Sequence, residues 1–290
     1  MNKRRFTLVE VMTAVAVFSI FMVLIIQFFV AAQKLWHATE TETRLSNKAA
    51  LVFNTIERCI RGAKLGQSPF YMSNATEDAF DIIISSPNGK RWEQDPNAYT
   101  AANSTKLVFV CRSEAKLHSG SLGKLYIIGF VQAQDRIQLR AICDRESNFW
   151  TLCSANRNDL LDEFDDAQGA WLGTSNDEFG SGQEGTSRVT HNLIDHVTSF
   201  EAIPYKLASG SSTDVLIPCD VTDFVSPGAP PYALMVKIVL LSDDDYAKWK
   251  TLCEMNAGSE SDAAKEFRKK AERSFSRLIY VGKSREVPNP

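Results

Sequence analysis

The chain has 290 residues, which is enough for one large or two small domains with a sizeable buried core. Its 32 Lys and Arg residues against 35 Asp and Glu residues give a formal net charge of -3, and this balance excludes the strongly basic surface of a general nucleic-acid-binding protein. The charges are segregated, because Lys3, Arg4 and Arg5 precede any acid, whereas residues 151–187 contain eight acids and a single base, Arg157.

The first predicted element is an apolar helix over residues 11–32. These 22 residues carry no charge, and Gln27 is their only strongly polar side chain. About 20 helical residues cross a hydrocarbon core of about 30 Å, and a helix of a globular core is rarely apolar on every face for so long. The sequence therefore predicts a single transmembrane helix. The positive-inside tendency places its N-terminus in the cytoplasm and exports the chain after about Lys34.

A cleaved secretory signal is the alternative interpretation of this segment. The apolar run is longer than the roughly 7–15 residues of a signal core, and no clear small-x-small cleavage site follows it. Glu10, at the start of the run, also argues against a cleaved signal. An ionised side chain in hydrocarbon costs on the order of 2.5–3.5 kcal/mol and needs a partner, so this residue is a candidate functional residue. A carboxylate resting among lipid headgroups is the alternative explanation, because Glu10 lies at the edge of the run.

Residues 4–11 read Arg-Arg-Phe-Thr-Leu-Val-Glu-Val. This segment resembles the processing and methylation site of type IV prepilins and pseudopilins. The resemblance implies that residues 1–5 are a leader peptide, that a prepilin peptidase cuts between Arg5 and Phe6, and that the new amine of Phe6 is N-methylated. The family has Gly where this chain has Arg5.

The spacing of Phe6 and Glu10 gives this resemblance a physical reason. After cleavage the amine of Phe6 would lie about one helical turn from the carboxylate of Glu10. In a medium of low dielectric these opposite charges favour pairing, within one subunit or, as the family implies, with the amine of a neighbouring subunit. We therefore expect Glu10 to be an assembly residue.

The helix is predicted to continue beyond the membrane. After Lys34, apolar residues recur at spacings of three and four, which is typical of a helix with one buried face. The members of this stripe are Leu45, Ala49, Val52, Phe53, Ile56, Cys59, Ile60 and Ala63. Gly62 and Gly66 are the first stop signals. The predicted domains are thus a spine helix over residues 6–64 and a periplasmic, β-rich head over residues 65–290.

The head is predicted to consist mainly of strands. Runs with strand-like composition cover residues 80–85, 106–111, 124–132, 136–143, 197–205, 214–218, 232–241 and 277–282. Residues 133–135 suit a hairpin turn, residues 154–187 an acidic loop, and residues 244–255 and 261–274 short helices. The predicted fold class is α+β, in which a long N-terminal spine helix, transmembrane in its first half, packs on a mainly antiparallel β-sheet head.

A second likeness lies in the head. Residues 192–201 and 231–241 resemble the late strands of J-type minor pseudopilins and their W-type pilus counterparts. This likeness implies a minor subunit of its machine, as does the size of the head.

All six cysteines follow the apolar run, so disulfides could form if this part of the chain is exported to an oxidising compartment. Six cysteines allow 15 complete pairings, and the sequence does not choose among them. Buried free thiols are an equal alternative. The six cysteines are Cys59, Cys111, Cys143, Cys153, Cys219 and Cys253.

We predict no metal site and no cofactor. His191 and His196 are five residues apart, which suits neither helical nor strand ligation. Two groups of acidic residues offer oxygen ligands and leave calcium as an alternative, although the EF-hand pattern is missing. The first group is Asp243, Asp244 and Asp245; the second is Asp159, Asp162, Glu163, Asp165 and Asp166. The first group is more simply an N-cap cluster that opens a helix.

No catalytic motif is recognisable, so we do not expect an enzyme. The expected function is a minor pseudopilin-like structural subunit of a type II secretion or type IV pilus-like system, held in the inner membrane by one span. Its expected partners are other pilin-like subunits, a prepilin peptidase and the inner membrane, with no nucleic acid. The alternatives are an anchored periplasmic binding protein that does not assemble and a membrane-tethered enzyme.

Overall fold

The computed structural model describes residues 7–63, 82–85, 106–111, 125–133, 135–144, 147–153, 160–161, 163–164, 188–207, 215–218, 231–255 and 260–281. The chain divides into two compact units, residues 1–46 and residues 47–290. The first unit contains most of one long helix. The second contains the end of that helix and all the described strands.

Helix α1 runs without a break over Leu8–Arg61, which confirms the predicted long N-terminal helix. Among the described residues, it is the one helix long and apolar enough to cross a membrane. Its polar hydroxyls are satisfied within the helix: Thr13 Oγ1 donates to the carbonyl oxygens of Val9 and Glu10, and Ser19 Oγ donates to that of Val15. Such local bonds suit hydrocarbon, because no hydroxyl then needs water.

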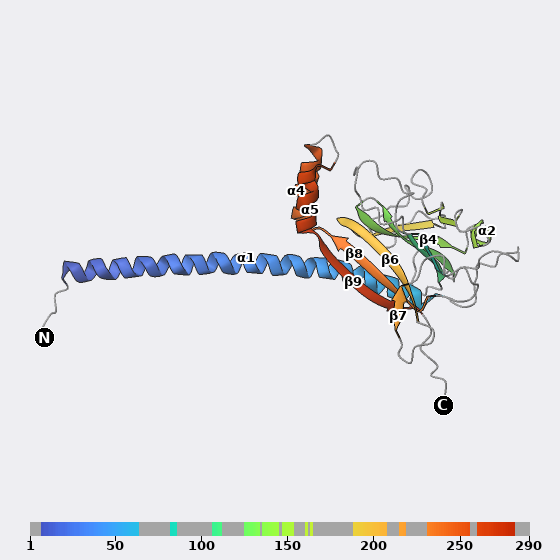
Figure 1. The fold of residues 1–290 in the computed structure, drawn as a ribbon, viewed down its shortest axis with the longest axis horizontal. Coiled ribbons are helices and arrows are strands. Elements are labelled where there is room, and N and C mark those ends of the chain that lie inside the picture. Colours follow the sequence, from blue (N-terminus) through green and yellow to red (C-terminus); the bar gives the residue numbers. More distant parts are fainter. Residues whose placement is uncertain are drawn as a thin grey trace, which may run out of the picture. The chain divides into compact units, whose positions relative to one another are not determined.

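The strands of the second unit form two antiparallel sheets (Figure 1). The five-stranded sheet has the order β1 (Ile82–Ser85), β2 (Lys106–Cys111), β3 (Tyr126–Ala133), β4 (Arg136–Cys143) and β5 (Arg188–Ile194). The four-stranded sheet has the order β7 (Leu216–Pro218), β6 (Val197–Leu207), β8 (Ala233–Leu240) and β9 (Arg273–Tyr280). The predicted α+β class is confirmed, with two sheets in place of the single sheet that we expected.

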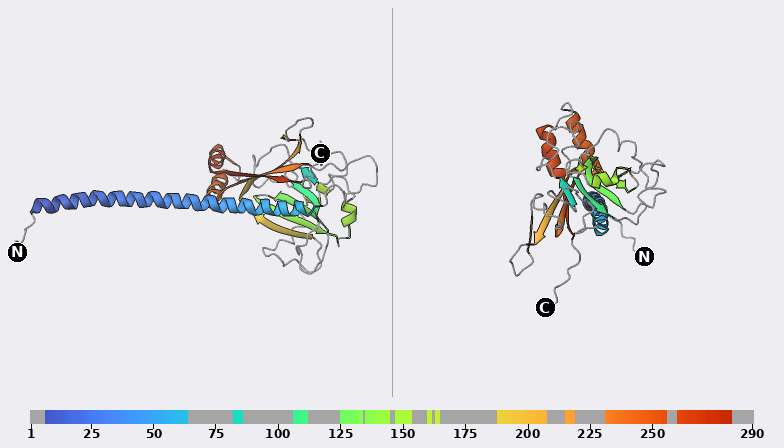
Figure 2. Two further views of the ribbon diagram at one scale, coloured as in Figure 1. Left: turned by 90° about the horizontal axis from the view of Figure 1, so that it is seen from below. Right: turned by 90° about the vertical axis from the view of Figure 1, so that its right-hand side faces the viewer.

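Three shorter helices complete the described elements of the head: α2 (Phe149–Cys153), α4 (Asp243–Glu254) and α5 (Asp262–Ala271). Helices α4 and α5 lie side by side (Figure 2). Between them lies a buried polar group in which Glu260 Oε1 accepts from Trp249 Nε1 at 2.9 Å and from Arg268 Nε at 2.7 Å. Trp249, Glu260 and Arg268 are all buried, so this group is a polar core between the two helices.

The last turns of α1 belong to the core of the head. Their buried side chains follow the predicted apolar stripe and include Ala49, Val52, Phe53, Ile56 and Ile60. Arg277 of β9 donates to Asn54 Oδ1 at 2.6 Å and pairs with Glu57 Oε2 at 3.1 Å. Ala63, just past the helix, pairs with Cys111 of β2. The end of α1 therefore contacts both sheets.

One face of the five-stranded sheet is covered by α2 and a segment that includes residues 160–161 and 163–164. Apolar side chains from both layers form one buried cluster there. Charged groups hold the covering segment: Lys106 Nζ donates to the Leu161 carbonyl oxygen at 3.4 Å, and Arg140 donates to that of Phe164. The ring of Phe164 lies where a Cβ atom at Gly129 would have to be, so β3 requires glycine at this position for packing.

The described strands and helices differ from the prediction in three places. Strand β5 and helix α2 were missed, and β9 begins at Arg273, whereas the sequence predicted a helix to Ser274 and a strand from Arg277. In β9 the pairing with β8 extends to Arg273, opposite Leu240, so sheet hydrogen bonds outweigh the helix-like composition before it. Strand β5 is polar at its centre and pairs along β4, which a local pattern does not reveal.

Candidate functional site

The predicted processing residues Arg5 and Phe6 lie outside the described residues, whereas Glu10 is described. Glu10 is exposed in the first turn of α1, and its Oε2 accepts from Thr7 N at 2.9 Å and from Thr7 Oγ1 at 3.0 Å. Glu10 N donates back to Thr7 Oγ1 at 3.4 Å. This reciprocal arrangement is a capping box, which satisfies backbone donors at the start of a helix.

The capping box gives Glu10 a local partner that the sequence prediction missed. Its signal was present, since Thr7-Leu8-Val9-Glu10 has the Ser/Thr-x-x-Glu spacing of this motif. Glu10 can therefore contribute to helix initiation as well as to the assembly role that the prepilin-like motif implies. The two roles are separable by mutation, because the first needs an acceptor and the second needs a charge.

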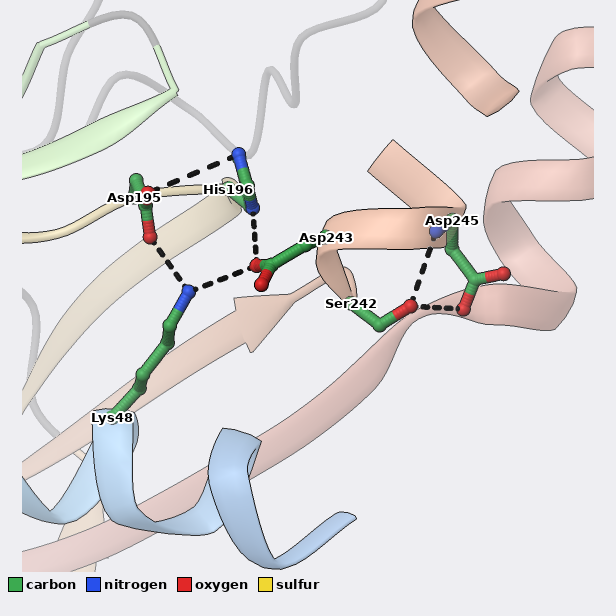
Figure 3. Close-up of polar contacts among 6 residues, drawn as sticks. All are labelled: Lys48, Asp195, His196, Ser242, Asp243 and Asp245. Carbon is green, nitrogen blue, oxygen red and sulfur yellow. Dashed lines mark hydrogen bonds and ion pairs between the residues drawn. The ribbon is translucent and has the colours of Figure 1, made fainter. Parts of the chain in front are cut away.

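A second polar site lies within the head unit, where three elements meet (Figure 3). We call Lys48, Asp195, His196 and Asp243 the Lys48 cluster. Lys48 of α1 donates from Nζ to Asp195 Oδ1 at 2.7 Å and to Asp243 Oδ1 at 3.1 Å. His196 Nδ1 lies 2.9 Å from the same Asp243 oxygen. One ammonium group thus joins α1 to the β5–β6 connection and to the start of α4.

The β5–β6 connection is the point where the chain passes from one sheet to the other. His196 has a φ of 60°, a left-handed conformation that lets the chain turn within two residues. Its ring stacks on Tyr246 with centroids 4.2 Å apart, and its carbonyl oxygen accepts from Leu241 N at 3.0 Å. The next amide, Val197 N, donates to the Asp135 carbonyl oxygen at 2.8 Å. The surroundings therefore fix this backbone conformation.

The electrostatics of the Lys48 cluster favour the charged forms of Lys48 and Asp195. Partial burial raises the pKa of the Asp195 carboxyl, but the hydrogen bond from Lys48 and the nearby positive charge outweigh burial and hold that pKa below its usual range. Asp195 is half-exposed, so solvent screens the ion pair and keeps its contribution to about 0.5–1 kcal/mol. The cluster therefore links α1, the β5–β6 connection and α4 through hydrogen bonds and ion pairs.

Ligand atoms of Asp195, His196 and Asp243 lie within 4.8 Å of one another, a spacing that could hold a metal ion. Lys48 contacts both carboxylates, so the chain's own cation already neutralises one of their two negative charges. A metal ion would have to displace that ammonium group. The donor set consequently fits an internal ion pair better than a calcium site.

Asp243, Asp244 and Asp245 lie at the start of a helix, as the sequence predicted, but none of them is the N-cap. The N-cap of α4 is Ser242, whose Oγ accepts from Asp245 N at 3.1 Å and donates to Asp245 Oδ2 at 2.7 Å. Asp243, Asp244 and Asp245 occupy the first turn, where negative charge complements the helix dipole. Ser242 thus satisfies a backbone donor of the first turn and also orients the Asp245 carboxylate.

The described members of the remaining candidates, His191 and Glu163, do not join the Lys48 cluster. His191 is buried within β5 and is not in the Lys48 cluster. Glu163 pairs with Arg188, which attaches the covering segment to β5. The other members of the acidic loop that were considered as calcium ligands, Asp159, Asp162, Asp165 and Asp166, lie outside the described residues, as does Cys219.

Comparison with known proteins gives no relative from which a function could be transferred. No family model, no curated protein and no solved structure matches this chain.

Proposed function

We propose that this protein is a minor pseudopilin-like subunit of a type II secretion or type IV pilus-like system, which is inserted in the inner membrane and assembles through α1. In this proposal the N-terminus faces the cytoplasm and the head is exported. Other pilin-like subunits pack against the apolar part of α1, and a prepilin peptidase removes residues 1–5.

The observation that carries the proposal is the continuity of α1. The helix begins at Leu8 in a segment apolar enough to cross a membrane and ends at Arg61 inside the head, where Val52 and Ile56 are fully buried. A simple membrane anchor needs no such continuation, because a flexible linker would tether the head equally well. A subunit that assembles through its helix is expected to bury the end of that helix in its head, as the side chains of the last turns of α1 are buried here.

The exposed apolar surface of α1 supports the same proposal. Large apolar side chains from Leu8 to Trp36 are exposed on the isolated chain. Within the membrane, lipid covers this surface, and in an assembly neighbouring helices would cover it. The arginine and lysine residues before Phe6 favour retention of the N-terminus in the cytoplasm.

Intact mass and N-terminal sequencing of protein from native membranes, with and without the prepilin peptidase, test the proposal. We expect a mature chain that begins at N-methylated Phe6 only when the peptidase is present. A terminus that stays at Met1 or Asn2 would contradict processing. The chain would then be better explained as an anchored binding protein that does not assemble.

A further inference from the structure

Two cysteine thiols meet where α1 ends on the five-stranded sheet. Cys59 lies in the last turns of α1, and Cys111 is the last residue of β2. The backbone of Cys111 pairs with Ala63, which lies four residues after Cys59 and just past the end of α1. The thiols of Cys59 and Cys111 are neighbours that affect each other's ionisation, and neither is in a disulfide. We call them the thiol pair.

The other described cysteines do not share this arrangement. Cys143 donates to its neighbour Asp144 at 3.3 Å. Burial raises the pKa of Cys153 to about 11, and burial together with nearby acids raises that of Cys253 to about 11, so these thiols stay protonated and unreactive. Each of the three serves as a small apolar core residue.

The members of the thiol pair differ in a way that suits oxidation. Cys59 is partly buried, whereas Cys111 is fully buried. The hydrogen bond from Cys111 holds the pKa of the Cys59 thiol below its usual value. A partly exposed cysteine with a lowered pKa beside a buried thiol suits the roles of an attacking and a resolving cysteine.

We propose that Cys59 and Cys111 form a disulfide bond that fixes the end of α1 to β2. This inference rests on the proposed function, because it requires the head to be exported to an oxidising compartment. The Cys59 thiolate would attack the disulfide of an oxidised dithiol protein, which forms a mixed disulfide and releases one thiolate of the oxidant. Cys111, on losing its proton, would attack the Cys59 sulfur and release the second thiolate. The oxidant thereby gains two electrons and the two protons lost by the cysteines.

Redox titration of the purified full-length protein in glutathione buffers tests the pairing independently of export. Peptide mapping without reductant should show the Cys59–Cys111 cross-link, and reductant should lower Tm by about 10 °C, since the bond closes a loop of about 50 residues. In the variant with both Cys59→Ala and Cys111→Ala, reductant should leave Tm unchanged. Cys153→Ala is the matched control, and its Tm should keep the full response to reductant.

Two outcomes would overturn the disulfide: a cross-link between Cys59 and a different cysteine, or alkylation of both thiols after full oxidation. A membrane-impermeant reagent that labels a single cysteine added at the C-terminus of intact cells reports export separately. If this reagent reaches the head while both thiols of the pair stay reduced in cells, the disulfide is wrong and export stands. If the reagent does not reach the head although the cross-link forms in the titration, the pairing stands and the proposed function is wrong.

Discussion

At the scale of single residues, Glu10 has two separable roles. Glu10→Gln removes the charge but keeps an acceptor for Thr7, since glutamine also completes a capping box. Thr7→Ala removes the capping hydroxyl but keeps the charge. If the carboxylate pairs with the amine of a neighbouring subunit, Glu10→Gln should reduce incorporation into the assembly at least tenfold, while Thr7→Ala should retain it. Co-purification with other pilin-like subunits from detergent extracts measures incorporation, and membrane levels of each variant correct for expression.

The opposite pattern would contradict the assembly role. Loss of incorporation in Thr7→Ala, with Glu10→Gln unaffected, would show that helix initiation is what matters at this position.

A second residue-scale prediction concerns the Lys48 cluster. Lys48→Met should lower the free energy of unfolding by about 1 kcal/mol at neutral pH, because two partly exposed ion pairs are lost. The folded-state pKa of Asp195 lies below its unfolded value, so its contribution is present above about pH 4 and is lost as pH falls through the folded pKa. The difference between wild type and variant should therefore shrink below about pH 4. Urea unfolding at a series of pH values measures it, and a difference that grew on acidification would contradict the ion pairs.

At the scale of elements, the buried pair between α4 and α5 gives the sharpest expectation. Arg268→Met leaves Glu260 buried without its cation and should destabilise the head by about 3–5 kcal/mol. Adding Glu260→Gln should recover part of the loss, because a neutral amide can still accept from Trp249. Thermal and urea unfolding of both variants measure the effect.

The chain offers a matched control for this pair on the same helix. Lys270 pairs with Glu266 on the exposed face of α5, so Lys270→Met should change stability by less than about 0.5 kcal/mol. Equal effects of Arg268→Met and Lys270→Met would contradict the buried role of Arg268.

The elements also show what could be predicted from the sequence. The apolar residues of α1 and the alternation in β3 and β4 are local patterns, and these elements were predicted to within a few residues. Strand β5 depends on pairing with β4, and the Lys48 cluster joins residues about 150 to 200 positions apart, so no local pattern reveals them. The capping box of Thr7 and Glu10 was readable, but the prepilin-like motif covers the same residues.

At the scale of the whole molecule, the boundary of the head lies inside α1. The second compact unit begins at Asn47, and its core includes Val52, Ile56 and Ile60. A fragment of residues 65–290 should therefore aggregate or stay unfolded, because several core side chains would be missing. A fragment that begins at residue 37 should give a soluble head with cooperative unfolding. Size-exclusion chromatography and circular dichroism distinguish the two, and a well-folded fragment 65–290 would contradict this boundary.

The buried indole of Trp249 also gives the head an optical reporter. Among the described tryptophans, Trp36 and Trp150 are exposed, whereas Trp249 is enclosed between α4 and α5. An enclosed indole emits at shorter wavelength than a hydrated one, so Trp249 should contribute a blue component to the intrinsic fluorescence that Trp36 and Trp150 do not. Loosening of the two helices would then be visible as a red shift without any added dye, even in detergent or in native membranes.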